Sequence, residues 1–386
     1  MASPYPSLFI TEQYLTIHWS DHESDNFWYA WLLDNAPLNR HSNGQKLTDT
    51  RLLDLEQKPN NIRLEGSQLF LRWGNTEIAY PLASLRSALI PLDSKLNFPA
   101  PVLWANKNSI SSYNYSEVTE QPSILLACLQ DIIIHGFTHL KDVPNESGTV
   151  LKLVELFGYV RETNFGKFYD VISKQDPENL ADTGLALAPH TDNPYRKLTP
   201  TIQLLHCLQA DTEGGETILM DGFFLAELLR FEQPYFFRLL SKYAVQFRYT
   251  TPIFDLFNEA RVIELDFTGA TFELDSHAAE VLGRDQLLVE QKIKSIKFNN
   301  RSIQPFQLSD ATMLPFYQAY QHFEGLLHKE EYQLCFKLQA GEAIIYDNER
   351  VLHGRTAFQV AVNRHLQGCY ADRDALLSKI RILSRK

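Results

Sequence analysis

The stretch Leu187–Arg196, LAPHTDNPYR, decides how the rest of the chain is interpreted. It places His190 and Asp192 one residue apart, between Pro189 and Pro194. Alternate side chains of a β-strand point to the same face, so the histidine and the aspartate are expected to project together. An imidazole and a carboxylate on one face can bind a divalent metal ion. The stretch therefore predicts part of a metal site.

The composition excludes several classes of protein. With 44% hydrophobic and 22% charged residues, the chain is expected to fold as a globular protein. Its net charge of −11 argues against nucleic acid as a partner, because binding a phosphate backbone needs a basic surface. There is no apolar run of about 18 residues, and the start MASPYPSLFITEQYLTIHW lacks the pattern of a signal peptide. We therefore expect a cytoplasmic protein with no membrane partner.

Two regions differ in pattern along the chain. Residues 1–95 contain five short strand-like runs, which predict a small β-rich domain: YLTIHW, FWYAWLL, NIRLEG, LFLRWG and TEIAYPL. The proline-rich stretch IPLDSKLNFPAPVLW follows and is expected to be a linker or a packed crossover. A second domain is placed at residues 96–386.

The second region alternates helical and strand-like patterns. PSILLACLQDIIIH predicts a helix that ends at Gly136, GFTHLKDV a strand, and GTVLKLVELFGYV another helix. Pro234 is expected to divide two helices, and ATMLPFYQAYQHFEGLLHK predicts a long one. Many short strands with segregated helices indicate an α+β protein, mainly β, built on an antiparallel barrel or sandwich.

The third candidate metal ligand is His353, in DNERVLHGRTAF. Two histidines and a carboxylate that leave open positions form the iron site of non-haem Fe(II) oxygenases. A cosubstrate such as 2-oxoglutarate would need a cationic side chain to bind its far carboxylate. Arg364 is the first candidate for this role and Arg355 the second. Taken singly, the H-x-D pair is also compatible with a hydrogen-bonded loop, and His353 with a structural histidine.

Six segments together resemble the γ-butyrobetaine hydroxylase family of Fe(II)/2-oxoglutarate dioxygenases: RETNFGKFYDV, PHTDNPYR, QLLHCL, GGETILMDGF, DNERVLHGR and RHLQGCYADRD. That family also includes trimethyllysine hydroxylase and 2-trimethylaminoethylphosphonate hydroxylase. The resemblance implies a double-stranded β-helix (jelly-roll) with flanking helices, and His190, Asp192 and His353 as iron ligands. It also implies 2-oxoglutarate bound by Arg364 near the main chain of Leu205, with O2 as second cosubstrate and ascorbate as reductant. Family members are often homodimers, and we expect one here.

The N-terminal region also resembles the family, through FWYAWLLDNAP, but departs from it in one respect. Many members have cysteines after this Asp-Asn that bind structural zinc, whereas the first cysteine here is Cys128. Zinc needs several thiolate or imidazole ligands, and His41 alone is insufficient. We therefore predict no zinc in this domain.

The resemblance also implies a pocket for a quaternary-ammonium acid. Aromatic faces attract such a cation, and Phe165, Tyr169 and Tyr370 would surround it, with Asp182 where relatives carry a tyrosine. The anionic end of the substrate would meet another group of side chains: Asn179, Asn193, Tyr195, Asn300 and Arg301. Each aromatic residue could instead be core packing, and Arg301 could point to solvent or pair with a surface acid.

The predicted function is hydroxylation of a small zwitterion that carries a quaternary ammonium and an acid. Because Arg301 suits a highly charged head group, 2-trimethylaminoethylphosphonate is the first candidate substrate and γ-butyrobetaine the second. A non-catalytic small-molecule binding protein of the same fold is the alternative from another class.

Overall fold

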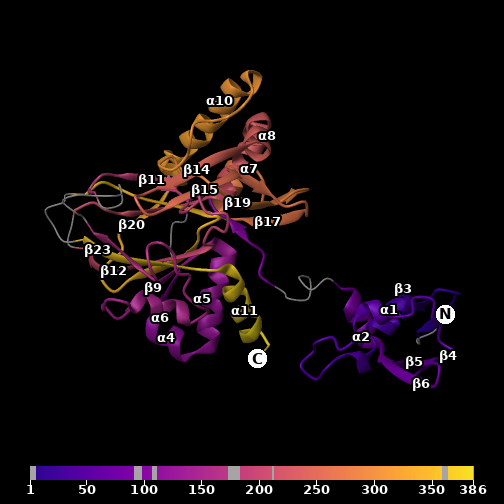
Figure 1. Cartoon of the computed structure of the whole chain (residues 1–386). Coiled ribbons are helices and arrows are strands. Elements are labelled where there is room, and N and C mark those ends of the chain that lie inside the picture. The colour runs from indigo at the N-terminus through magenta and orange to yellow at the C-terminus, as the bar shows by residue number, and fades with distance from the viewer. Residues whose placement is uncertain are drawn as a thin grey trace. The chain divides into compact units, whose positions relative to one another are not determined.

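The computed structural model describes residues 6–90, 98–106, 111–172, 183–210, 213–358 and 364–385. The chain forms two compact units, residues 1–97 and residues 98–386. Each is described by itself (Figure 1). The predicted linker falls partly on residues 91–97, which lie outside the described residues.

The N-terminal unit consists of two three-stranded antiparallel sheets and short helices. The first sheet holds β1 (Ser7–Ile10), β2 (Tyr14–His18) and β3 (Ser24–Trp28), and the second β4 (Asn61–Glu65), β5 (Gln68–Trp73) and β6 (Thr76–Pro81). The helices are α1 (Tyr29–Asp34) and α2 (Leu82–Leu89). The run FWYAWLL is therefore a strand only as far as Trp28. Beyond it the chain is helical, because Tyr29 and Leu32, one turn apart, both bury against the unit's apolar core.

The C-terminal unit is a jelly-roll of two facing sheets. The larger has the order β10–β23–β12–β21–β9–β8, and the smaller β11–β22–β13–β20. The larger sheet comprises β8 (Ser112–Asn114), β9 (Phe137–Lys141), β10 (Tyr169–Ile172), β12 (Ile202–Ala210), β21 (Ala343–Asp347) and β23 (Arg364–Ala371). The smaller comprises β11 (Leu187–His190), β13 (Thr217–Asp221), β20 (Leu334–Phe336) and β22 (Val351–Arg355). Cys207 and Ile344 of the larger sheet pack against Leu219 and Val351 of the smaller, so a buried core joins the two sheets.

Helices cover the outer face of the larger sheet: α4 (Tyr115–Glu120), α5 (Pro122–His135), α6 (Thr149–Glu155) and α11 (Arg373–Leu383) (Figure 1). As predicted, α5 ends at Gly136, whose φ of +83° suits glycine at a helix C-terminus. Alternation along β12 gives the sheet two faces. Leu204 packs beneath the helices, whereas Gln203 and Leu205 face the interior of the jelly-roll.

A second helical layer packs on the remaining strands. It contains α7 (Gly222–Glu232), α8 (Pro234–Lys242), α9 (Ser276–Leu282) and α10 (Asp310–Leu327). The smaller strands here are β7 (Val102–Leu103), β14 (Ala244–Thr250), β15 (Asp255–Arg261), β16 (Ile263–Leu265), β17 (Ala270–Leu274), β18 (Gln286–Val289) and β19 (Ile293–Ile296). Pro234 begins α8, so it divides two helices as predicted. Among the described residues, no helix has the length and apolar character needed to cross a membrane.

His206 on β12 is a buried histidine that should make stability depend on pH. Its exposed fraction is 0%, both ring nitrogens are without partners among the described residues, and burial lowers its pKa to about 4. The unfolded chain gains a proton near the ordinary value of 6.5, whereas the folded chain does not until about 4. Stability is therefore complete above about pH 6.5 and falls as the pH drops towards 4, by about 3 kcal/mol in total.

Replacing His206 with leucine is expected to flatten this dependence. The measurement is urea unfolding between pH 4.5 and 7.5, followed by circular dichroism. His277→Leu, at a partly exposed histidine of α9, is the control and should leave the dependence unchanged. A His206→Leu variant that loses as much stability on acidification as the parent protein would contradict this assignment.

Candidate active site

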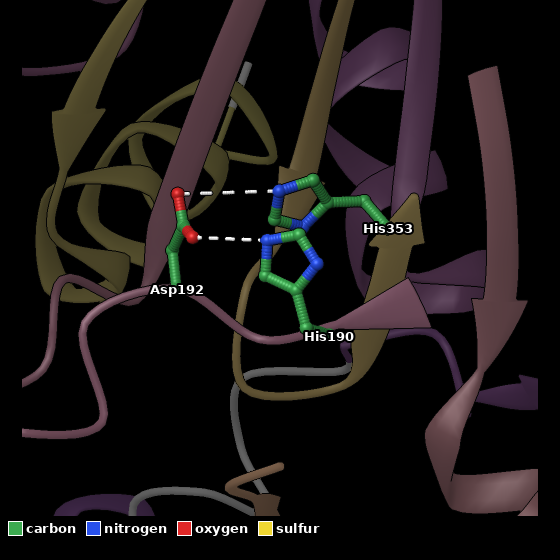
Figure 2. A group of neighbouring side chains, drawn as sticks. All are labelled: His190, Asp192 and His353. Carbon is green, nitrogen blue, oxygen red and sulfur yellow. Dashed lines mark ion pairs between the residues drawn. The ribbon is translucent and has the colours of Figure 1, made fainter. Parts of the chain in front are cut away.

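Two neighbouring strands of the smaller sheet, β11 and β22, bring the three predicted metal ligands together (Figure 2). His190 is the last residue of β11 and lies directly opposite His353 of β22 in the strand register. Asp192 follows the end of the strand and does not belong to it. The strand stops there because Asn193 adopts a positive φ of +56° and a proline follows. The turn nevertheless points Asp192 towards both histidines.

The three side chains offer their ligand atoms to one point. His190 Nε2 lies 3.3 Å from Asp192 Oδ1, and His353 Nε2 lies 3.9 Å from Asp192 Oδ2. One ligand atom from each residue falls within 4.8 Å of the other two. Two imidazoles and one carboxylate arranged this closely form the donor set of a facial non-haem iron site.

Neighbouring groups hold these ligands in orientation. His190 Nδ1 lies 2.9 Å from the carbonyl oxygen of Ala188, which can only accept, so Nδ1 carries the proton and Nε2 carries the lone pair with which the imidazole would bind a metal. The Asp192 carboxylate accepts from Gln203 Nε2 at 2.9 Å and from the Tyr370 hydroxyl at 3.0 Å. The amide of Asn348 bonds to both the main-chain N–H and the carbonyl of Asp192, at 2.7 and 2.9 Å.

The protonation states also suit a metal. Burial lowers the pKa of His190, and burial together with His190 lowers that of His353 to about 3. Burial alone would raise the pKa of Asp192, but its interactions with His190, His353 and Arg301 outweigh this effect and lower it. Neutral imidazoles beside an ionised carboxylate are the forms that ligate a divalent ion. The donor set therefore fits Fe(II).

A cavity of about 790 Å³ opens beside these ligands. This volume lies within the range typical of small-molecule sites and suffices for two small ligands. At one side Leu205, Thr217, Arg355 and Arg364 line it. Arg355 donates to the carbonyl oxygens of Thr183 and Leu185.

Arg364, like Arg355, packs against the ring of Phe358. Its guanidinium carbon lies 5.2 Å from the ring centre of Phe358, and burial lowers its pKa. Gly215 makes room for it, because a Cβ there would lie 3.1 Å from Arg364 Nε. Among the described residues, no carboxylate pairs with the Arg364 guanidinium, whereas Arg355 already donates to two main-chain carbonyls, so Arg364 is better suited than Arg355 to receive an anionic ligand.

Most of the predicted substrate residues line the same cavity: Phe165, Tyr169, Asn193, Tyr195, Arg301 and Tyr370. Asn300 does not. Its amide donates to Glu324 and accepts from the Tyr320 hydroxyl, whereas its neighbour Asn299 does line the cavity. Asn179 and Asp182 lie outside the described residues.

Arg301 reaches into the site. The residue is exposed overall, yet its Nη2 lies 2.6 Å from His190 Nε2. The alternative of a guanidinium directed to solvent is therefore wrong for this residue. Arg301 places a positive charge beside the metal ligands.

The sequence analysis missed four residues that belong to the site: Gln203, Tyr249, Asn299 and Asn348. Gln203 could have been found, since it alternates with Leu205 on a strand already implicated in the site. Asn348 lies five residues before His353, in a turn that carries no metal-ligand pattern of its own.

Comparison with known proteins agrees with this geometry. Residues 101–370 match the family described as "Taurine catabolism dioxygenase TauD, TfdA family". A gamma-butyrobetaine dioxygenase from Pseudomonas sp. (strain AK-1) is 32% identical over 397 residues, covering 100% of this chain and 97% of the relative. Human mitochondrial trimethyllysine dioxygenase is 28% identical over 396 residues, covering 96% of this chain and 88% of the relative.

Among solved structures, the chain aligns with the non-heme iron oxygenase OrfP in complex with Fe and alpha-ketoglutaric acid. The alignment has a TM-score of 0.45 and 12% sequence identity, and it covers 68% of this chain and 94% of that chain. The family match and the relative that aligns over the whole chain are what decide the assignment. The chain belongs to the TauD/TfdA family, together with the γ-butyrobetaine and trimethyllysine dioxygenases, and is a 2-oxoglutarate-dependent dioxygenase that uses Fe(II).

Proposed function

We propose that this enzyme hydroxylates γ-butyrobetaine to L-carnitine. The observation that carries the proposal is the aromatic lining of the cavity beside the metal ligands. Tyr370 donates to Asp192, its ring centre lies 5.4 Å from that of Tyr169, and Tyr169 lies 6.0 Å from Phe165. Adjacent aromatic faces attract a trimethylammonium group, which cannot donate hydrogen bonds. The full-length similarity to a gamma-butyrobetaine dioxygenase supports the same substrate.

This proposal corrects the preference for 2-trimethylaminoethylphosphonate. That preference depended on Arg301, which does reach the cavity. A guanidinium forms paired hydrogen bonds with a carboxylate as readily as with a phosphonate, so one arginine cannot tell the two apart. The relatives favour the carboxylate substrate.

The two ends of the substrate would meet different groups. Asn193 is 2% exposed, and its Nδ2 is without a hydrogen-bond partner among the described residues, while its Oδ1 accepts from Tyr195. A buried donor left unpaired costs free energy, which a ligand acceptor in the cavity would recover. We therefore assign the substrate carboxylate to Asn193 and Arg301, and the ammonium to the aromatic rings.

The cosubstrates supply the chemistry. Bound Fe(II), O2 and 2-oxoglutarate provide the oxidising power, with 2-oxoglutarate leaving as succinate and CO2. The protein's part is to orient the ligands and to hold the substrate carbon against them. Gln203 and Tyr370 keep the Asp192 carboxylate facing both histidines while the aromatic rings fix the substrate.

Arg364 is assigned to the far carboxylate of 2-oxoglutarate. Removing its charge in Arg364→Met should raise the KM for 2-oxoglutarate by roughly 10- to 100-fold, since a charge-assisted hydrogen bond contributes about 1.5–3 kcal/mol. The KM for γ-butyrobetaine should change little. The measurement is succinate release against 2-oxoglutarate concentration. An equal rise in both KM values would show that Arg364 acts only by holding the fold.

The substrate assignment is tested by offering three compounds to the Fe(II)-loaded enzyme: γ-butyrobetaine, trimethyllysine and 2-trimethylaminoethylphosphonate. The highest kcat/KM for hydroxylated product, detected by NMR, is expected with γ-butyrobetaine. A higher value for the phosphonate would restore the role first given to Arg301. Binding of all three without turnover would favour a non-catalytic binding protein.

A further inference from the structure

The β14–β15 hairpin forms part of the cavity wall, although neither of its strands is part of the sequence prediction. Tyr249, near the end of β14, lines the cavity. Its ring is stacked on that of Tyr195, with centres 5.1 Å apart and an interplanar angle of 20°. Its other neighbour is Phe165, with centres 5.8 Å apart at 61°. Tyr249 thus occupies the space between two rings that both line the cavity.

These contacts extend the aromatic wall. Tyr370, Tyr169, Phe165, Tyr249 and Tyr195 form an unbroken series in which each ring contacts the next. The series runs from the hydroxyl that bonds to the metal ligand Asp192 to the hydroxyl that bonds to Asn193. A substrate that spans the distance between the metal ligands and Asn193 would lie along this wall.

The hairpin is fixed at both ends of the site. The main-chain N–H of Arg248 donates to Ser302 at 2.8 Å, and that of Gln304 donates to Gln246 at 2.8 Å, so β14 is paired with the segment that follows Arg301. On the other strand, Asn258 donates to the carbonyl of Pro194 at 2.9 Å, beside Tyr195. The hairpin that carries Tyr249 is therefore held by hydrogen bonds to the two segments that carry the site's polar groups.

From this placement we propose that Tyr249 is a specificity-determining residue that offers an aromatic face to the quaternary ammonium of the substrate. The inference rests on the proposed function and adds a ring from the hairpin to the three already assigned. Phe165 contacts both Tyr169 and Tyr249, so it connects the three rings already assigned to the ring from the hairpin.

The test compares two substitutions and two ligands. Tyr249→Leu removes the ring and Tyr249→Phe keeps it, while Tyr317→Leu, at a half-exposed tyrosine of α10 outside the cavity, is the matched control. The ligands are γ-butyrobetaine and 5,5-dimethylhexanoate, in which an uncharged tert-butyl group replaces the trimethylammonium. KM, kcat and binding by calorimetry are measured on the Fe(II)- and 2-oxoglutarate-loaded enzyme, with anaerobic conditions for binding.

Tyr249→Leu is expected to weaken binding of γ-butyrobetaine by roughly 3- to 30-fold, the effect of one cation–π contact, and to leave the KM for 2-oxoglutarate unchanged. Binding of 5,5-dimethylhexanoate should fall much less, so discrimination between the two ligands shrinks. Tyr249→Phe and Tyr317→Leu should keep it. Equal losses for both ligands, or no loss, would overturn the inference and leave Tyr249 a packing residue.

Failure of the proposed function would look different. In that case the unsubstituted enzyme would bind γ-butyrobetaine no better than the uncharged analogue, and tetramethylammonium would not bind either. That result would overturn both proposals. If the parent enzyme prefers γ-butyrobetaine and the Tyr249→Leu variant binds it equally well, only the assignment of Tyr249 is overturned.

Discussion

Replacing Asp192 with alanine is expected to abolish turnover and to release the metal. Asp192 supplies the carboxylate of the ligand set and lies within 3.3 and 3.9 Å of the two imidazoles. Loss of a residue that merely bonds to a metal ligand typically costs 10- to 100-fold in affinity or activity, so loss of a ligand should cost more than about 100-fold. Succinate release and metal content after equilibration with Fe(II) measure the two effects.

Asp170→Ala is the matched control for this substitution. Asp170 lines the same cavity but bonds to His365 and Gln367 on β23 instead of facing the imidazoles. This variant should keep one equivalent of metal. If Asp192→Ala also retained its metal and worked within tenfold of the parent rate, the assignment of the iron ligands would be wrong.

Replacing Arg350 with methionine is expected to cause the largest loss of stability, about 3–5 kcal/mol. Arg350 and Asp221 form a buried ion pair, with Arg350 Nε 3.1 Å from Oδ1 and Nη2 2.7 Å from Oδ2. The same guanidinium donates to the carbonyls of Val102, Ile133 and Ile134. The variant would leave the Asp221 carboxylate, 1% exposed, without its charged partner.

The position of this pair links stability to the active site. Arg350 immediately precedes β22, which carries His353, and Asp221 caps α7 through the main-chain N–H of Phe223. Urea unfolding followed by circular dichroism measures the loss. Arg248→Met is the control, because its pair with Asp255 is about half exposed, so solvent screens it and it should contribute little to stability. Equal losses in the two variants would show that burial of the Arg350 pair has no special effect.

Much of the C-terminal unit could be predicted because local patterns and tertiary structure agree there. The apolar periodicity of α5 ends at a glycine with positive φ, and Pro234 starts a helix where its missing N–H costs nothing. The metal ligands could be predicted because the H-x-D pair, the distant histidine and the following arginine occur in a recognisable order.

Other features depend on contacts that the sequence does not display. The run FWYAWLL has strand-forming residues throughout, yet its second half is helical because the N-terminal core buries Tyr29 and Leu32. Asn300 and Asn299 are equally good candidates by residue type, and only the tertiary structure shows that Asn299 lines the cavity while Asn300 bonds to Tyr320. In β14, Val245, Phe247 and Tyr249 alternate as a strand should, but nothing in AVQFRYT shows that the last ring reaches the site.

The central claim is that the His190, Asp192 and His353 centre couples the decarboxylation of 2-oxoglutarate to hydroxylation of γ-butyrobetaine. The most direct measurement is the ratio of succinate to hydroxylated product in one reaction mixture. The predicted result is one succinate for each carnitine, with succinate release strongly dependent on γ-butyrobetaine. Succinate that forms at the same rate without γ-butyrobetaine, and without any hydroxylated product, would contradict the account.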